Sequence, residues 1–290
     1  MDSSGKCWQV IFAKQTPDNE AFGNFLENYF DVVSCDYTED GFDIWSGYKN
    51  SKFNKDEFLE HAKSQNISLP SYETKLLEST DWLKDNVIEF APVDTEKFLI
   101  YGIHEKQTPT TDKLAIRIYA ATAFGSEHQT TRSCLQGICD IDNMKLPHQN
   151  ILDVGCGSGI LSLACAKLWK DCKITAVDID DEAVIVTNQN AQDNQLSEQI
   201  NCFWSDGYKN PQVQKNAPYD IILANILARP LIEMAPSLTN SLKIGGKAII
   251  SGFVEDQAEW VIKAHTDEGL KHIKTYSFDN WRAALLEKTA

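Results

Sequence analysis

The stretch ILDVGCGSGILSLACAKLW, residues 151–169, constrains the fold more than any other part of the chain. Residues 151–154 are mostly apolar and predict a buried strand, and the apolar residues after Gly159 recur at helical spacing. Glycines at every second position, 155, 157 and 159, separate the two. Glycine tolerates positive φ and lets another molecule approach the backbone, and a helix start offers unpaired N–H groups. The pattern predicts a nucleotide-type ligand over this turn. The alternative is a glycine-rich turn that holds no ligand.

Strands and helices alternate along residues 113–290, which predicts a doubly wound, mostly parallel α/β sheet. The last two expected strands, 272–278 and 281–288, are joined by a two-residue turn. They predict a closing hairpin that adds an antiparallel strand. The five other expected strands are 151–154, 173–180, 200–206, 219–225 and 247–253, which makes a seven-stranded sheet.

The N-terminal part of the chain has a different order. Residues 7–77 follow the order β-α-β-β-α-β, which predicts a small α+β, ferredoxin-like domain. Prolines and the run KQTPTTD give the region after it the character of a linker. We therefore expect a domain at residues 1–79, a linker at 80–112 and a second domain at 113–290.

The formal net charge of −15 argues against nonspecific binding to nucleic acid, which relies on Lys and Arg. None of the eight cysteines forms a C-x-x-C pair, and neither they nor the scattered histidines have the spacing of a metal site. The N-terminus lacks the pattern of a signal peptide, and no apolar stretch is long enough to span a membrane. We expect a cytoplasmic protein that binds no metal, nucleic acid or membrane.

The spacing G-x-G-x-G narrows the choice of ligand class. It differs from the G-x-G-x-x-G of dinucleotide sites, and no Lys-Ser/Thr follows it as in a phosphate-binding Walker loop. Asp178 ends the next strand, 23 residues after Gly155. A carboxylate there can accept both ribose hydroxyls of an adenosyl group, in NAD or in S-adenosylmethionine (SAM). The alternative is a charge at the start of a helix, a role that suits Asp180 and Asp181 better.

Two other polar residues follow strands. Asn225 ends the strand YDIILAN, at the edge of the sheet where open α/β folds bind their ligands. Its amide offers an acceptor and a donor, and amine methyltransferases resemble this arrangement. The alternative is that Asn225 caps the following helix. Asp206 is a weaker candidate for the adenine edge, because an Asp before Gly is also ordinary turn chemistry.

The segments LDVGCGSG and VDID, with the C-terminal hairpin, look like a class I SAM-dependent methyltransferase. With AFGSEHQTT (123–131) and ANILARPLIEMAPSL (224–238), the chain resembles the ribosomal protein L11 methyltransferase family over most of residues 114–290. The resemblance implies SAM contacts from four residues: Thr131, Gly155, Asp178 and Asn225. It also implies that Asn225 holds the target nitrogen.

The segment 124–131 departs from the family pattern A-F-G-[TS]-G-x-H-x-T-T, because it lacks one glycine and is one residue shorter. In the family this loop folds over the cofactor. His128 lies in it, and we interpret this residue as a loop histidine bonded to the backbone rather than as a catalytic group.

The resemblance implies a SAM-dependent protein-lysine N-methyltransferase. Its substrate would be ribosomal protein L11, modified on lysine ε-amines and on the N-terminal α-amine, with residues 1–79 recognising that substrate. One alternative is a SAM-dependent methyltransferase for another protein or a small molecule. Another is a catalytically silent adaptor that binds SAM or the ribosome, which the shortened loop motivates.

Overall fold

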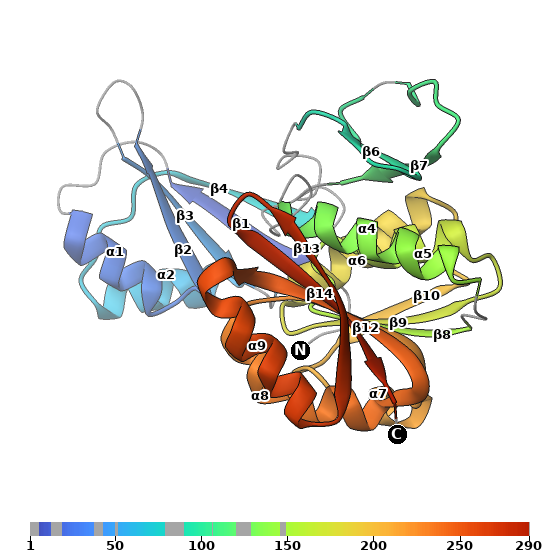
Figure 1. Cartoon of the computed structure of the whole chain (residues 1–290). Coiled ribbons are helices and arrows are strands. Elements are labelled where there is room, and N and C mark those ends of the chain that lie inside the picture. Colours follow the sequence, from blue (N-terminus) through green and yellow to red (C-terminus); the bar gives the residue numbers. More distant parts are fainter. Residues whose placement is uncertain are drawn as a thin grey trace. The chain divides into compact units, whose positions relative to one another are not determined.

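The computed structural model divides the chain into two compact units, residues 1–86 and 87–290 (Figure 1). The structure describes residues 6–12, 19–37, 43–49, 52–78, 90–105, 107–119, 129–145 and 149–289.

The first unit is a four-stranded antiparallel sheet with two helices. The strands lie in the order β2-β3-β1-β4, as the order β-α-β-β-α-β requires when each crossover inserts one strand. Aromatic side chains from both helices and from the sheet form its core. The elements are β1 (Lys6–Phe12), α1 (Asn19–Glu27), β2 (Val32–Tyr37), β3 (Asp43–Lys49), α2 (Lys55–Ser64) and β4 (Tyr72–Glu78).

The second unit is built on a seven-stranded sheet in the order β10-β9-β8-β11-β12-β14-β13, in which β14 runs antiparallel to both neighbours. This confirms the predicted doubly wound sheet and its closing hairpin. Its strands are β8 (Asn150–Val154), β9 (Lys173–Asp178), β10 (Ile200–Trp204), β11 (Tyr219–Asn225), β12 (Leu242–Val254), β13 (Leu270–Phe278) and β14 (Trp281–Lys288). Its helices are α4 (Gln129–Asn143), α5 (Ile160–Leu168), α6 (Asp181–Asp193), α7 (Pro211–Asn216), α8 (Ala228–Ser241) and α9 (Glu255–Asp267).

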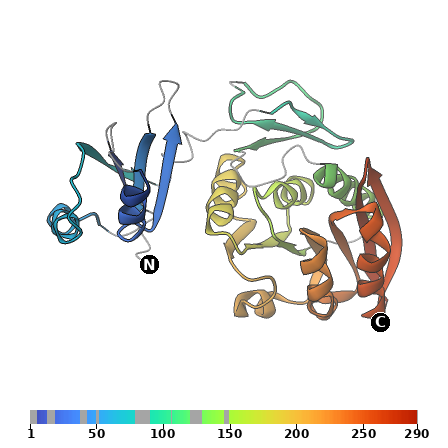
Figure 2. The same cartoon turned by 90° about the vertical axis from the view of Figure 1, so that its left-hand side faces the viewer.

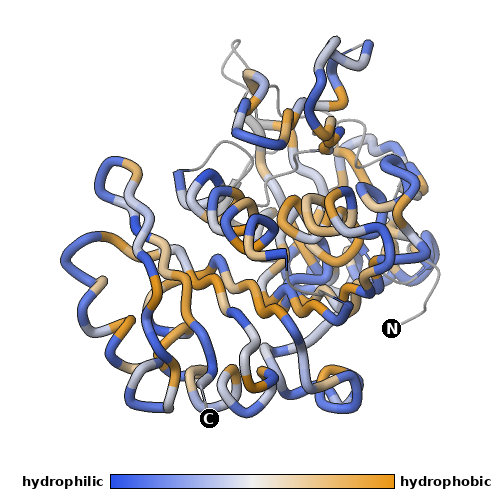
Figure 3. The backbone as a smooth tube through the Cα atoms, turned by 45° about the vertical axis from the view of Figure 1, so that its right-hand side comes forward, coloured by the Kyte–Doolittle hydropathy of each residue, from blue (hydrophilic) through white to orange (hydrophobic). Residues whose placement is uncertain are grey.

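Helices cover both faces of this sheet, with α4 and α5 on one face and α8 and α9 on the other (Figure 2). Successive residues of β11 alternate between the two cores: Ile221 and Leu223 belong to the first, and Ile222 and Ala224 to the second. Strands buried on both faces must be apolar at nearly every position, and Figure 3 shows such hydrophobic runs along the central strands. Of the helices that the structure describes, none has the length and apolar character needed to cross a membrane.

A small three-stranded sheet also belongs to the second unit. It consists of β5 (Val93–Asp94), β6 (Phe98–Gly102) and β7 (Leu114–Ile118), in that order. Phe98 and Ile100 are fully buried in the core that includes α4 and α5, and such burial stabilises a fold by about 1.5–3 kcal/mol per side chain.

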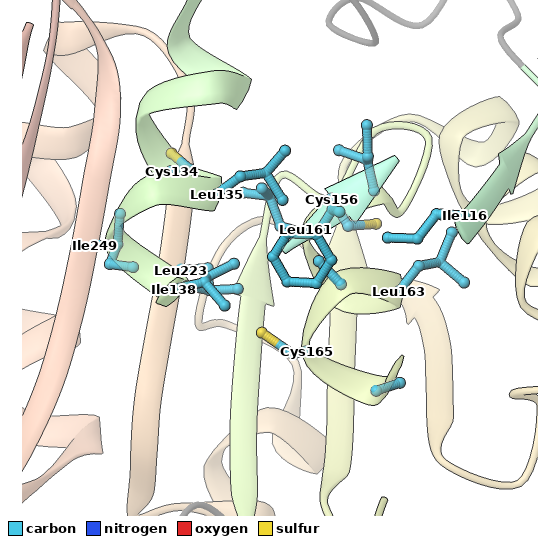
Figure 4. Packing of buried hydrophobic residues seen from close by; sticks show 14 of the residues in the cluster. Ile116, Cys134, Leu135, Ile138, Cys156, Leu161, Leu163, Cys165, Leu223 and Ile249 are labelled. Atoms are coloured by element: carbon cyan, nitrogen blue, oxygen red, sulfur yellow. The ribbon is translucent and has the colours of Figure 1, made fainter. Parts of the chain in front are cut away.

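Figure 4 shows the same core from close by. Leu163 of α5 lies beside Ile116 of β7, and Ile138 of α4 lies beside Leu223 of β11. The interval 80–112, predicted as a linker, thus contains two strands of the second unit, β5 and β6. The sequence signals for a linker, Pro92 and Pro109, lie outside these strands.

Candidate functional site

The turn after β8 has a backbone conformation that favours glycine. Gly155, Gly157 and Gly159 all have left-handed backbone conformations, with φ of 70°, 55° and 77°. The turn is held against β9, because the backbone N–H groups of Gly155 and Cys156 both donate to the carbonyl of Val177, at 2.8 and 3.1 Å. The predicted strand, turn and helix are therefore present, and the turn has a fixed shape.

Packing also requires glycine in this turn. A Cβ atom on Gly155 would overlap the side chain of Ile226, and one on Gly159 would lie 2.9 Å from side-chain atoms of Thr187. Ile226 directly follows β11, and its N–H donates to the carbonyl of Ser251 at 3.0 Å. The glycine turn and the loop after β11 are therefore in direct contact.

This contact lies at the point where the strand order of the sheet reverses. β8 and β11 are parallel neighbours, but β9 and β10 follow on one side of β8 while β12 follows on the far side of β11. Open α/β sheets bind their ligands at such a switch point, outside the carboxyl ends of the strands. Gly155 and Asn225 therefore flank the place where this fold class holds a ligand.

Asp178 ends β9, and its carboxylate is fixed by two backbone groups. One oxygen accepts the N–H of Gly157 at 2.9 Å, and the other accepts the N–H of Asp180 at 3.1 Å. Each carboxylate oxygen has about two acceptor positions, so these contacts leave one on each oxygen for a ligand. Asp180 accepts from the N–H of Glu182 at 2.9 Å and is the N-cap of α6. The alternative role considered for Asp178, a charge at the helix start, is therefore filled by Asp180.

Asn225 is the last residue of β11 and is half-buried. The following helix, α8, begins at Ala228 with Leu227 as its N-cap, and no side chain caps it. The alternative that Asn225 caps this helix is therefore wrong, because the chain makes a further two-residue bend first. Among the described residues, none has a hydrogen bond to the Asn225 side chain, so its carbonyl and amide groups can serve a ligand.

Thr131 lies in the first turn of α4 and is buried, and it has interactions of its own. One turn later, the thiol of Cys134 lies close to Ser251, the residue of β12 that pairs with Asn225. Burial raises the pKa of this thiol to about 12, so it stays protonated at neutral pH. The start of α4 therefore lies close to the same strand ends. Residues 120–128, with His128 and most of the shortened segment, are outside the described residues.

Asp153 is a candidate site residue that the sequence reasoning did not single out. It is fully buried in β8. One carboxylate oxygen accepts both the N–H and the hydroxyl of Ser162, at 3.1 and 2.6 Å, and the other has no partner among the residues that the structure describes. Burial raises the pKa of this carboxyl group to about 6. A buried acceptor without a partner calls for an explanation, and here it lies two residues before Gly155. The only feature of the sequence that could have pointed to Asp153 is that it is the one acidic residue in the apolar strand 151–154.

Asp206 follows β10 in a turn. Its carboxylate pairs with Lys209 at 2.6 Å, and its carbonyl accepts the N–H of Lys209 at 3.2 Å. These contacts are those of ordinary turn chemistry, so the role at the adenine edge stays a prediction.

The residues at these strand ends fit SAM by their chemistry. The acceptor positions of Asp178 suit a ribose diol, and the unpartnered oxygen of Asp153 suits a cationic or N–H group. SAM carries a ribose, an ammonium group and a positively charged sulfonium. In the described part of the chain, no cluster of His, Cys, Asp and Glu has the arrangement of a metal site.

Comparisons with known proteins agree with this chemistry. The family model for ribosomal protein L11 methyltransferase (PrmA) matches residues 18–289. The ribosomal protein L11 methyltransferase of Rhizobium meliloti (strain 1021) is 32% identical over 87% of this chain and 91% of its own length. That of Brucella suis (strain ATCC 23445 / NCTC 10510) is 37% identical over 74% of this chain and 75% of its own length.

A solved structure supports the fold. The ribosomal protein L11 methylase from Lactobacillus delbrueckii subsp. bulgaricus has a TM-score of 0.61 at 24% identity, over 70% of this chain and 100% of that chain. The family model spans nearly the whole sequence, and together with the relatives it confirms the predicted class, a methyltransferase that uses SAM. The chain belongs to the ribosomal protein L11 methyltransferase family.

Proposed function

We propose that this protein transfers methyl groups from SAM to amino groups of ribosomal protein L11, namely lysine ε-amines and the N-terminal α-amine. The observation that carries the proposal is the contact between the glycine turn and the loop after β11. Through Gly155 and Ile226, it brings the end of β11, with the amide of Asn225, next to the turn over which the cofactor is expected. The name of the family supports the substrate.

The proposed cofactor contacts are Thr131, Gly155, Asp178 and Asn225. SAM supplies an electrophilic methyl group on a positively charged sulfur. The protein then has to bind and orient the two reactants. Asp178 can take the ribose hydroxyls because its carboxylate is already held in place by two backbone N–H groups.

The attacking amine must be neutral, and this requirement defines the role proposed for Asn225. A free lysine has a pKa of about 10.4 and an α-amine one of about 8, so the lysine must lose a proton to react at neutral pH. Proximity to the sulfonium disfavours the charged amine. The Asn225 carbonyl can then accept an N–H of the neutral amine and aim its lone pair. Orientation of this kind can supply about 7–11 kcal/mol of the barrier reduction.

Residues 1–79 are proposed to recognise the protein substrate. Every cofactor motif lies after residue 120, in the second unit, and the first unit has a separate core of its own. The first unit can therefore have a function other than cofactor binding. A cytoplasmic location, where ribosomal proteins are made, is part of this proposal.

Replacing Asp178 by Ala should weaken SAM binding by about 1.5–3 kcal/mol, the usual contribution of hydrogen bonds to a charged group. Calorimetric titration with SAM measures this. The matched control is Asp180→Ala, which removes the cap of α6 and should lower stability by about 1 kcal/mol without changing SAM affinity. Equal affinities in the wild type and the Asp178 variant would remove Asp178 from the site.

Replacing Asn225 by Ala should slow single-turnover methylation about a hundredfold, because the amine loses its orienting acceptor. The melting temperature should stay unchanged, since this side chain caps no helix. Asn210→Ala is the control: Asn210 accepts the N–H of Gln212 at 2.9 Å and caps α7, so its loss should lower the melting temperature and leave the rate unchanged. A normal rate for the Asn225 variant would contradict its proposed role.

The substrate is tested by transfer of tritiated methyl groups to purified ribosomal protein L11. The full chain should label it, and a chain that begins at Val87 should bind SAM but lose most of the labelling. The start at residue 87 matters, because a start after the interval 80–112 would remove the buried strand β6.

Each other outcome of this assay points to a different function for the chain. SAM binding without transfer to any ribosomal protein would indicate a silent adaptor. Transfer only to other proteins or small molecules would contradict the L11 substrate. Full labelling by the shortened chain would contradict substrate recognition by the first unit.

A further inference from the structure

Helix α6 carries one buried asparagine, Asn190, and a second buried asparagine, Asn194, is its C-cap, one helical turn further along. Asparagine is a poor residue for a helix interior, because its amide competes with the backbone for hydrogen bonds. Asn190, fully buried inside the helix, therefore needs a specific reason.

Both side chains bond to the backbone of the segment that contains β7. The carbonyl of the Asn190 side chain accepts the N–H of Tyr119 at 2.7 Å, and its NH₂ group donates to the Tyr119 carbonyl at 3.1 Å. In the same way, the side-chain carbonyl of Asn194 accepts the N–H of Arg117 at 3.1 Å, and its NH₂ group donates to the Arg117 carbonyl at 2.6 Å. β7 is the edge strand of the small sheet, so alternate residues have no strand partner on that side. The two amides take the place of such a partner.

The two asparagines differ in one contact. The NH₂ group of Asn190 also donates to the carbonyl of Ser158 at 2.8 Å, in the glycine turn between Gly157 and Gly159. The corresponding bond of Asn194 goes to the carbonyl of Asn190, within its own helix, at 2.8 Å. Asn190 is thus bonded to the cofactor turn, and Asn194 is not.

A second residue of α6 also holds this turn. The hydroxyl of Thr187 donates to the carbonyl of Gly157 at 2.8 Å, so two successive carbonyls of the turn are bonded to the same helix. A trans peptide directs its C=O and N–H groups to opposite sides. With the Gly157 carbonyl fixed on α6, the Ser158 N–H faces away from the helix, where a ligand can accept it.

We propose that Asn190, assisted by Thr187, is a positioning residue for the cofactor site. It locks the shape of the glycine turn and ties that turn to Tyr119. Tyr119 is the residue directly before the segment 120–128, whose other end leads into α4 and Thr131. One buried amide thus joins the glycine turn, which is expected to contact SAM, to the segment that contains β7.

The test compares Asn190→Ala with Asn194→Ala. Each variant loses two bonds to the backbone of this segment, Asn190→Ala those to Tyr119 and Asn194→Ala those to Arg117, so both should have lowered melting temperatures. Only the first releases the glycine turn. We expect the dissociation constant for SAM to rise about tenfold in Asn190→Ala and to stay within about twofold in Asn194→Ala, by calorimetry well below both melting temperatures. The KM for SAM should rise with it, while the KM for the protein substrate stays unchanged.

Thr187→Val keeps the proposal testable if Asn190→Ala does not fold. This change is nearly the same in volume and removes only the hydroxyl, which contacts the turn and not β7. It should weaken SAM binding by about three- to tenfold. Wild-type affinity in Thr187→Val, or equal losses in the two asparagine variants, would overturn the proposal.

Discussion

The close contact between Gly155 and Ile226 is the constraint on which the rest of the site depends. It exists because Gly155 has no side chain and adopts a left-handed conformation that other residues rarely accept. The contact joins the ends of β8 and β11 at the switch point of the sheet. The carboxylate of Asp178 and the amide of Asn225 project from the same edge of the sheet, each at the end of its strand.

The support for this edge comes from the layers behind it. β8, β9 and β11 are buried on both faces, so the turn and strand ends rest on a rigid base. α6 adds a second support from the side, through hydrogen bonds from Thr187 and Asn190 to two successive carbonyls of the turn. Preorganisation of this kind lowers the cost of ordering the site when a ligand binds.

Much of the fold could be predicted because its signals are local. The glycine turn, the apolar strands and the closing hairpin each have a pattern within a few residues, and all are present. The small sheet was harder, because β6 looks like any short apolar strand and only its packing against α4 and α5 assigns it to the second unit. α7 is six residues long and has no periodicity that could be recognised.

In the site, too, some residues have a local sequence pattern and others depend on contacts between distant parts of the chain. Gly155, Asp178 and Asn225 stand at strand ends, where sequence position alone suggests a role. Asn190 acts on Tyr119, which is 71 residues away, and such a bond from a side chain to a distant backbone leaves no local pattern. For Asn225, only the observed start of α8 excludes the capping role.

We infer that close packing at Gly155, and not glycine flexibility alone, builds the cofactor site. Gly245 gives the matched control: its φ is 79°, against 70° at Gly155, but a Cβ atom there would meet nothing within 4 Å. The measurement is the calorimetric SAM affinity of Gly155→Ala and Gly245→Ala, which carry the same left-handed strain of about 1–3 kcal/mol. We expect Gly155→Ala to lose about a hundredfold or more in SAM affinity and Gly245→Ala to bind SAM as the wild type does. Wild-type affinity in Gly155→Ala would contradict it.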